Sequence, residues 1–387
     1  MSHFNFEPVT LPPEAVRLRA EVRAFCAEER ANGSFAPSVG AMVEADESFS
    51  AKCGARGLLG LTWPKQYGGQ ERSSLERYVV VEELLAAGAP VMCHWVAERQ
   101  SGPQILRHGS ERAKQLILPR IAAGRCYFAI GMSEPDTGSD LASVRTRAHK
   151  VDGGWRITGR KVWTSFAHRA HYVIALVRTS GSPEQRHHGL TQLIIDLKTP
   201  GVAVRPIYNV YGGHDFNEVT FDDAFCPEDM SIGGEGRGWE MVTGELAFER
   251  SGPDRFMSTF PLLVEAFNQA GPDPDKHAAV ELGRLVAHLS TLRRMSSSIA
   301  GLLQAGHSPV TEAAVVKDLG TAFEQEIPEV VRRVLPIEPP MPASQGAPDA
   351  DYATLQGLSQ MQCVSYSIRG GTREILRGMI ARGLGLR

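Results

Sequence analysis

The stretch that decides the fold is FAIGMSEPDTGSD, residues 128–140. It begins as an apolar run and continues into a turn rich in proline and glycine, with Ser133, Thr137 and Ser139 as small hydrogen-bond donors. Glycine adopts backbone conformations that other residues avoid, so the amides of such a turn can approach a flat or anionic ligand closely. Taken alone, the stretch is equally compatible with an ordinary surface loop, and its meaning depends on its neighbours.

The segments on either side of this turn differ in periodicity. Apolar residues recur at helical spacing before it, at residues 15–31, 73–88 and 110–124. Short β-rich runs follow, separated by Gly, Pro and Ser, at residues 144–151, 154–163, 172–179, 190–197 and 217–225. Helical spacing returns at residues 239–251, 256–270, 276–305 and 311–334, and a proline-rich stretch at 336–350, expected to be an exposed loop, precedes a last helical segment.

This order of patterns predicts an α+β fold in three parts. We expect an N-terminal α-helical domain at residues 1–125, a compact and mostly antiparallel middle β domain at 126–236, and a C-terminal α-helical domain at 237–387. A chain of 387 residues is long enough for such a multi-part enzyme.

Composition excludes several classes of function. The formal net charge of −3 and the pI near 6.5 argue against nucleic-acid binding and against binding to a membrane surface. Without a long apolar window or a signal-peptide pattern at its start, the chain is expected to be soluble and cytoplasmic. Its six cysteines form no CxxC pair, and His168 with His171 lacks a third ligand of suitable spacing, so we expect buried thiols and no metal site.

The turn is followed, about two dozen residues later, by GRKVWTS at 159–165, and together they resemble the flavin-binding signature of the acyl-CoA dehydrogenase family. The stretch 221–250, FDDAFCPEDMSIGGEGRGWEMVTGELAFER, looks like that family's passage from the β domain into its C-terminal helices. GGTREILRGMIARGL, at 370–384, looks like its terminal segment. Several motifs in the expected order make the resemblance specific, and it spans nearly the whole chain.

The resemblance implies a flavoprotein that carries FAD, oxidises an acyl-CoA thioester to its 2,3-enoyl form and passes electrons to an electron-transfer flavoprotein. It also implies a cofactor site, in which Ser133 bonds the flavin ring edge, Trp163 packs on the isoalloxazine, and Ser165 contacts the flavin. Met132, Gly138 and Ser139 would complete the turn, the last two near cofactor phosphates or coenzyme A. Without this context, Trp163 would be interpreted as an ordinary core aromatic.

Such a reaction needs a carboxylate beside the substrate Cα, with its pKa raised towards neutrality by an apolar pocket. Many members of the family place this glutamate just before a Gly-Thr pair, where this chain has Gly370. Others, including isovaleryl- and long-chain-type enzymes, place it before an arginine, an arrangement that LAFER at 246–250 matches. Glu249 is therefore the predicted base, and Arg250 the predicted coenzyme A contact.

Pro253 lacks an N–H for the carbonyl of Glu249, so we expect the helix to kink there and to aim the side chain into a cavity. The alternatives are that Glu249 is a surface residue paired with a nearby arginine, and that Glu374, one turn beyond Gly370, is the base.

Two motifs with which homotetramers of the family hold FAD across subunits are missing. FNQAGPDPDKHAAVEL stands at 267–282 where an Arg-x-x-Phe-Gly stretch is expected, and residues 336–362 lack the Gln followed by a Gly-Gly turn. We therefore expect a second acyl-CoA dehydrogenase-like subunit in an α2β2 assembly, similar to those of actinobacterial steroid and sterol side-chain breakdown. Glycine at position 370 would leave room for a bulky acyl group.

Two other functions remain compatible with the sequence. One is a catalytically silent subunit kept for assembly, and the other is a flavin monooxygenase or oxidase, because one fold supports several chemistries.

Overall fold

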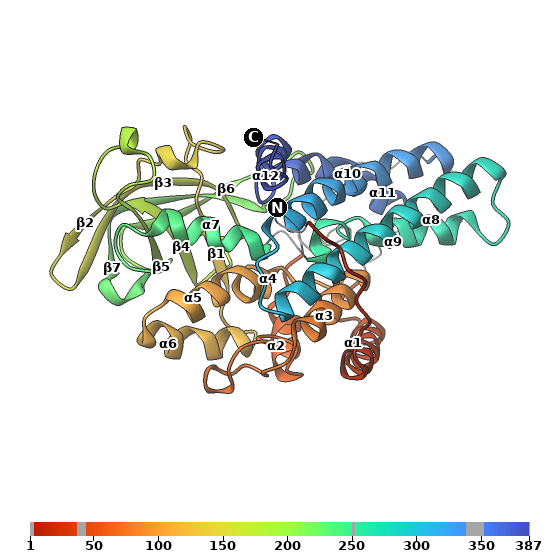
Figure 1. Cartoon of the computed structure of the whole chain (residues 1–387), viewed down its shortest axis with the longest axis horizontal. Coiled ribbons are helices and arrows are strands. Elements are labelled where there is room, and N and C mark those ends of the chain that lie inside the picture. Colours follow the sequence, from red (N-terminus) through yellow and green to blue (C-terminus); the bar gives the residue numbers. More distant parts are fainter. Residues whose placement is uncertain (1–3, 37–43, 250–251, 338–351, 387) are drawn as a thin grey trace. The chain divides into compact units, whose positions relative to one another are not determined.

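The computed structural model describes residues 4–36, 44–249, 252–337 and 352–386, apart from the side chains of 245–249 (Figure 1). The chain folds into two compact units, each built from separated stretches of sequence. The first comprises Met1–Ala45, Arg72–Val91 and Ala247–Arg387, and the second comprises Asp46–Glu71 and Met92–Leu246. The proline-rich stretch predicted to be a loop lies mostly outside the described residues. The three expected domain ranges stay a prediction.

The first unit is helical. Its helices are α1 (Pro13–Ala31), α3 (Ser74–Ala86), α8 (Phe260–Ala270), α9 (Lys276–Gln304), α10 (Val310–Val334), α11 (Tyr352–Gln362) and α12 (Arg373–Gly383). α10 packs against α8, α9, α11 and α12, so it is the central helix of the C-terminal group (Figure 1). Short 3-10 turns, η6 (Pro253–Arg255) and η7 (Cys363–Ile368), precede α8 and α12.

Local capping sets where several of these helices begin. Ser73 and Glu76 form a reciprocal capping box at the start of α3, in which each side chain bonds the other residue's backbone N–H. Asp275 accepts hydrogen bonds from two amides at the start of α9, and Thr372 accepts one at the start of α12. These caps satisfy amides that the helix itself leaves unpaired.

Charged groups also join helices of the first unit. Glu82 and Glu83 of α3 are buried, and they pair with Arg19 and Arg23 of α1, while Glu82 also pairs with Arg293 of α9 at 2.6 Å. Two adjacent buried carboxylates require such cations, because an unpaired buried charge is costly.

The second unit combines helices with a sheet. The helices are α2 (Glu47–Ala55), α4 (Met92–Val96), α5 (Gly102–His108) and α6 (Glu111–Ala122), followed after the strands by α7 (Gly238–Glu249), whose last three residues belong to the first unit. The strands are β1 (Phe128–Gly131), β2 (Arg147–Val151), β3 (Gly154–Ser165), β4 (Tyr172–Arg178), β5 (Leu190–Asp196), β6 (Val202–Ile207), β7 (Phe216–Pro227) and β8 (Ser231–Ile232).

Within the described residues the strands form one sheet in the order β6-β7-β3-β2-β4-β5-β8, with β1 added beside β4 (Figure 1). All pairings are antiparallel except those of β4 with β1 and β2. β4 is buried along its whole length, which explains its nearly continuous apolar sequence YVIALV. The predicted α+β architecture of N-terminal helices, a mostly antiparallel middle sheet and C-terminal helices is confirmed.

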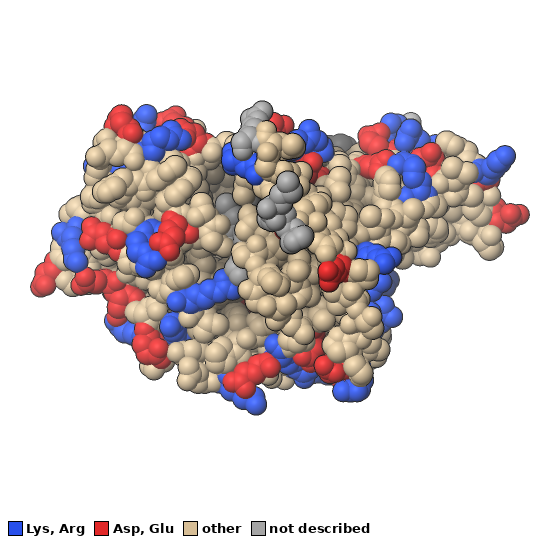
Figure 2. Space-filling view, in the orientation of Figure 1, with Lys and Arg blue, Asp and Glu red and all other residues tan. Residues whose placement is uncertain are grey.

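The charged surface and the cysteines agree with what the composition predicts. Lys, Arg, Asp and Glu side chains lie interspersed on the face shown in Figure 2. All six cysteines are buried, as predicted. Among the described residues, none of the helices is both long and apolar enough to cross a membrane.

Candidate active site

The turn at 132–140 is tied to the sheet by its own backbone. Glu134 and Thr137 exchange backbone hydrogen bonds of 2.8 and 3.1 Å, which close the turn tightly. The carbonyl of Ser133 accepts a hydrogen bond of 3.0 Å from the amide of Val162 in β3. Ser133 therefore lies beside the strand position that precedes Trp163, and the structure brings these two predicted flavin contacts together.

A buried ion pair between Lys161 and Glu134 also holds this turn. Lys161 of β3 is fully buried, and its Nζ donates to Glu134 Oε1 at 2.8 Å and to the carbonyl of Met132 at 3.0 Å. The Glu134 carboxylate also accepts from the amides of Arg145 and Thr146, at 2.7 and 2.9 Å. These contacts engage both oxygens of the buried Glu134 carboxylate and tie the turn to β3 and to residues 145–146.

The protonation of this pair follows from its surroundings. Burial lowers the pKa of Lys161 to about 8, although Glu134 opposes the shift. Burial acts to raise the pKa of Glu134, but Lys161 and the hydrogen bonds together hold it below its ordinary value. Both groups are thus charged at neutral pH. Sequence reasoning missed this pair, because β3 reads GWRITGRKVWTS and its other polar residues leave Lys161 unremarkable in the local sequence.

Trp163 is the most unusual residue of the site. Its side chain is 60% exposed, and its backbone has φ 57°, which is rare for a residue other than glycine. The register of β3 against β7 shifts between Lys161 and Thr164, so a bulge turns this residue outward. The ring of Phe216 meets the indole edge-on with centroids 6.0 Å apart. Trp163 is therefore not the buried core aromatic that its sequence taken alone would suggest.

The remaining predicted cofactor residues lie around this pair. Ser165 ends β3 and is half-buried, as are Met132 and Ser133. Met132 packs on a small core cluster formed by Val144, Leu176, Leu190 and Val242. Gly138 and Ser139 are exposed, and a side chain added at Gly138 would find no atom within 4 Å. The outer part of the turn is thus open to a ligand.

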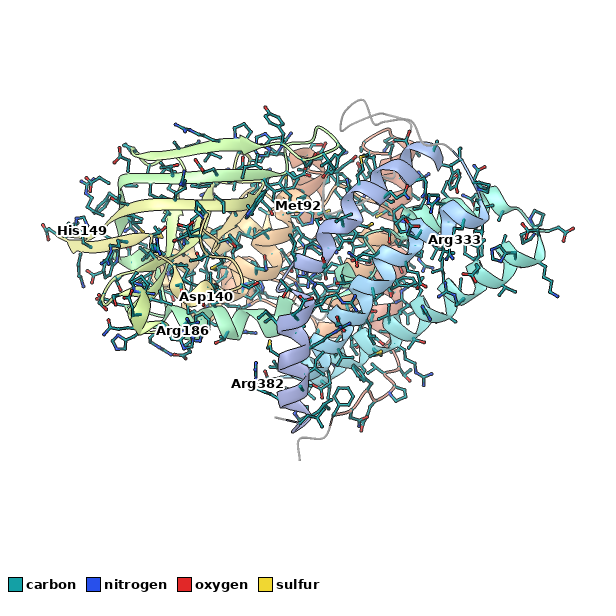
Figure 3. All side chains as sticks on the ribbon, turned by 90° about the horizontal axis from the view of Figure 1, so that it is seen from above. Met92, Asp140, His149, Arg186, Arg333 and Arg382 are labelled. Carbon is teal, nitrogen blue, oxygen red and sulfur yellow. The ribbon has the colours of Figure 1, made fainter. Side chains whose placement is uncertain are left out.

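The acidic residues of the turn have basic partners. Asp140 pairs with Arg186 at 2.6 Å, and the two side chains lie next to each other in Figure 3. Asp136 lies 3.8 Å from Arg145. These ion pairs reduce the negative charge that a phosphate group would meet at the outer turn.

A polar cluster not predicted from the sequence lies beside Trp163. Asn217 of β7 donates to the carbonyl of Thr164 at 3.0 Å, and its Oδ1 contacts ring nitrogens of His168 and His214 at 3.2 and 2.8 Å. The two imidazoles stack with centroids 3.9 Å apart. His171, considered with His168 as a metal pair, instead accepts a hydrogen bond from the amide of Tyr127. The described residues contain no cluster of three or more His, Cys, Asp or Glu side chains that could hold a metal ion.

The candidate bases belong to the first unit. Glu249 is the last described residue of α7, and Arg250 lies outside the described residues, as does the expected kink itself. Gly370 and Gly371 have φ of 63° and 102° in the turn before α12, conformations that favour glycine. Glu374 is exposed in the first turn of α12.

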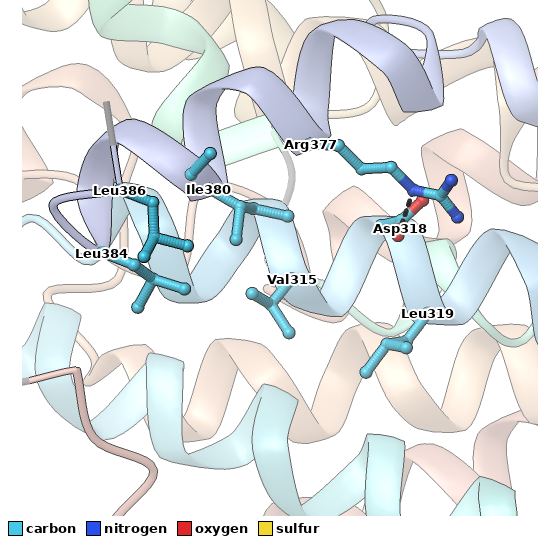
Figure 4. A pocket seen from close by; sticks show the side chains of 8 residues that line it. Val315, Asp318, Leu319, Arg377, Ile380, Leu384 and Leu386 are labelled. Carbon is cyan, nitrogen blue, oxygen red and sulfur yellow. Dashed lines mark hydrogen bonds and ion pairs between the residues drawn. The ribbon is translucent and has the colours of Figure 1, made fainter.

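A shallow hollow on α10 and α12 contains none of these residues. It measures about 370 Å³ and is lined by Val315, Asp318, Leu319, Arg377, Ile380, Ala381, Leu384 and Leu386 (Figure 4). Its walls are apolar except where Asp318 pairs with Arg377 at 3.3 Å. Leu386 in this lining is 72% exposed, and Val364 of η7, which packs against α10, is 70% exposed.

Comparison with known proteins agrees with the geometry. The profile of the acyl-CoA dehydrogenase N-terminal domain matches residues 12–125, and that of the acyl-CoA dehydrogenase middle domain matches residues 129–224. Acyl-CoA dehydrogenase IpdE1 of Mycobacterium tuberculosis is 32% identical over 382 residues, which cover 95% of this chain and 97% of that protein. Acyl-CoA dehydrogenase FadE34 of the same organism is 32% identical over 333 residues, and this chain spans 44% of its length.

Two solved structures show the same fold. The ChsE4-ChsE5 complex from Mycobacterium tuberculosis contains a chain that superimposes with a TM-score of 0.82 at 29% identity, covering 98% of this chain and 100% of that one. A structure described as the Tcur3481-Tcur3483 steroid ACAD matches with a TM-score of 0.82 at 27% identity and the same coverage. This chain belongs to the acyl-CoA dehydrogenase family, whose members are flavoprotein oxidoreductases that act on acyl-CoA.

Proposed function

We propose that this protein is an FAD-dependent acyl-CoA dehydrogenase that introduces a Cα=Cβ double bond into a bulky acyl-CoA, with Glu249 as the base. The observation that carries the proposal is the exposed Trp163 indole, held outward by a strand bulge beside the Ser133 turn. An indole that is kept out of the core at a strained backbone position offers a flat surface for a ring system.

The described residues fit a flavin. Trp163 would pack on the isoalloxazine, Ser133 and Met132 would bond its edge through the tied turn, and Ser165 would contact it from the end of β3. Gly138 and Ser139 would approach phosphate groups of FAD or coenzyme A, because the turn is open there. FAD, when bound, supplies the acceptor for the hydride that leaves the substrate Cβ.

The chain itself would supply the proton acceptor. Glu249 takes the proton from Cα, and the electron pair of that C–H bond becomes the new double bond as hydride leaves Cβ. Two features support this position over its rivals. Position 370 has a left-handed backbone that disfavours glutamate, and Glu374 is exposed. Arg250 would bind coenzyme A next to the base.

A bulky acyl group is the proposed substrate. Glycine at position 370 removes a side chain from the segment that carries the base in many relatives, and one matched structure is described as a steroid ACAD. An acyl-CoA derived from a steroid or a sterol side chain fits both observations. An electron-transfer flavoprotein would reoxidise the cofactor.

A second, acyl-CoA dehydrogenase-like subunit is the proposed partner, in an α2β2 assembly. Two matched structures carry names of paired proteins, and this chain lacks the motifs with which family homotetramers complete the FAD site. The apolar surface over α10, η7 and α12 is the kind of surface that a subunit interface covers.

The test is to produce the protein alone and together with acyl-CoA dehydrogenase-like chains encoded near it, and to measure flavin content, mass and turnover. We expect FAD and activity with bulky acyl-CoAs only in a complex of two different chains. Full FAD occupancy and turnover in the lone protein would contradict the proposed need for a partner subunit. Oxygen consumption without an added electron acceptor would indicate an oxidase, and flavin that no acyl-CoA reduces would indicate a silent subunit.

A further inference from the structure

Glu324 of α10 is a fully buried carboxylate that contacts two distant segments at once. Its Oε1 accepts a hydrogen bond of 2.7 Å from the backbone amide of Ser258, and its Oε2 pairs with Arg369 Nη2 at 2.6 Å. Arg369 Nη1 in turn donates to Ser258 Oγ at 3.1 Å, which closes a ring of three residues. The hydroxyl of Thr259 donates to the carbonyl of Glu324 at 3.3 Å.

The two segments joined by this ring are the ones that flank the candidate bases. Residues 252–259 begin three positions after Glu249 in the sequence, and Arg369 immediately precedes Gly370. The first segment is deeply buried, with Asp254, Phe256 and Thr259 at 0% exposure. Both segments are short turns between helices and have no sheet or long helix of their own to position them.

α10 holds each segment by more than the ion pair. A Cβ added at Gly320, one turn before Glu324, would come within 2.2 Å of the carbonyl oxygen of Arg255, so the helix lies directly against the first segment. Lys317 Nζ also donates to the carbonyl of Tyr366 at 3.2 Å, and the Arg369 guanidinium lies 4.0 Å from the Tyr366 ring centroid. A rigid helix thus provides a common reference for both turns.

Charge makes the arrangement specific. Burial raises the pKa of Glu324, and the opposing charge of Arg369 and the Ser258 hydrogen bonds favour its ionised form. Arg369 is 20% exposed, so it can be replaced with less disturbance than Glu324. A hydrophobic residue at position 324 would fill the same space without binding either turn, so space filling alone does not explain a glutamate there.

We propose that Glu324 and Arg369 are positioning residues that set the spacing between the segment following Glu249 and the Gly370 turn. The inference rests on the proposed function, in which the thioester is held near both. Neither residue touches the substrate in this proposal. They act by keeping the base in its productive position, and displacements of about 1 Å cost on the order of 100-fold in rate.

The test uses the full chain with its flavin and any partner subunit, and compares Glu324→Gln, Arg369→Lys and Arg369→Gln with wild type. The amide of the Glu324→Gln variant keeps an acceptor for the Ser258 N–H but loses the ionic bond to Arg369. The matched control is Glu326→Gln on the same helix, which loses a 2.5 Å ion pair with Arg284 and contacts neither turn. Readouts are hydrogen–deuterium exchange of peptides covering 252–259 and 366–372, thermal unfolding, kcat and KM.

In Glu324→Gln we expect faster exchange in both peptides together, and a fall in kcat of about 10- to 100-fold with KM changed by less than about threefold. Arg369→Lys should lose less activity than Arg369→Gln, because lysine keeps the charge but not both donors. The double variant Glu324→Gln/Arg369→Gln should be no slower than the worse single variant. The Glu326→Gln control should match wild type.

Exchange that rises in only one peptide, or equally throughout the chain, would overturn the positioning role, as would an unchanged kcat in an active enzyme. Exchange is measurable even if wild type turns over no acyl-CoA. Coupled exchange of the two peptides in an inactive wild type would therefore support the pairing of the turns while rejecting the proposed function. If Glu324→Gln fails to fold, the same measurements on Arg369→Lys test the positioning role.

Discussion

Lys161 Nζ lies 2.8 Å from Glu134 Oε1 and also donates to the carbonyl of Met132, and the lysine side chain is completely buried. One cation thereby holds both the carboxylate and the backbone of the turn that carries Ser133. The pair holds the backbone that carries Met132 and Ser133, so its contribution is to fix the positions of these two proposed flavin contacts.

Replacing Lys161 with methionine should destabilise the protein by about 3–5 kcal/mol, because it leaves the buried Glu134 carboxylate without a cation. FAD content should fall as well, because the turn loses its anchor. Urea denaturation of the protein, and the flavin absorbance of its purified complex with the partner subunit, measure the two effects. The control is Lys150→Met, which removes an exposed pair with Glu228 and should leave the midpoint unchanged. Equal midpoints for both variants would contradict the role given to Lys161.

Trp163→Gly should separate flavin binding from folding. Glycine accepts a φ of 57° without strain, so the free energy of unfolding should stay constant or rise by about 1 kcal/mol. FAD binding should weaken by about tenfold, because the stacking surface is gone. Denaturation of the apoprotein and fluorescence titration with FAD test this, with Trp163→Phe expected to lie between. A large loss of stability with unchanged FAD affinity would contradict flavin stacking and indicate that Trp163 serves only in packing.

Glu249→Gln should lower kcat by about 10²- to 10⁴-fold, because the variant has no group to take the Cα proton. FAD content and thermal unfolding should match wild type. The rate of anaerobic flavin reduction by the acyl-CoA substrate, monitored by stopped-flow absorbance, measures the dehydrogenation step directly. Glu374→Gln is the control, since this residue is exposed at the start of α12 and should leave the rate unchanged. A large fall in kcat for Glu374→Gln and none for Glu249→Gln would identify Glu374 as the base instead.

Acid should weaken the second unit through His94. Burial lowers the pKa of His94 from 6.5 to about 4, and its Nδ1 lies 2.8 Å from Ser50 Oγ. Between these pH values the unfolded chain binds a proton that the folded chain excludes. Stability therefore rises with pH across this window and is lost as pH falls, by up to about 1.4 kcal/mol per pH unit.

Urea denaturation at pH 7, 6 and 5 tests this dependence. His94→Gln should reduce the slope, because glutamine does not titrate. His149→Gln, on the exposed strand β2 (Figure 3), should leave the slope as in wild type. A slope that is the same in all three proteins would assign the acid sensitivity to other groups.

The sequence alone predicted the fold class, and it named the candidate site residues. Helical spacing and β-rich runs are local signals, and they located α1, α3, α6 to α10 and the strands β2 to β5 and β7, because burial imposes those periods. The short helices α2, α4 and α5 were not predicted. Motif order placed the Ser133 turn next to Trp163, and a backbone hydrogen bond between Val162 and Ser133 joins them as expected. The choice of Glu249 as base remains a prediction.

Only the tertiary structure revealed which charges are buried and what they hold. Lys161 with Glu134, and Glu324 with Arg369, are separated by 27 and 45 residues, and nothing in their local sequence marks them as partners. The exposure of Trp163 likewise depends on a bulge that arises from the register of β3 against β7. Secondary structure is specified by neighbours along the chain, whereas ion pairing and burial depend on which distant segments the folded backbone brings within a few ångströms.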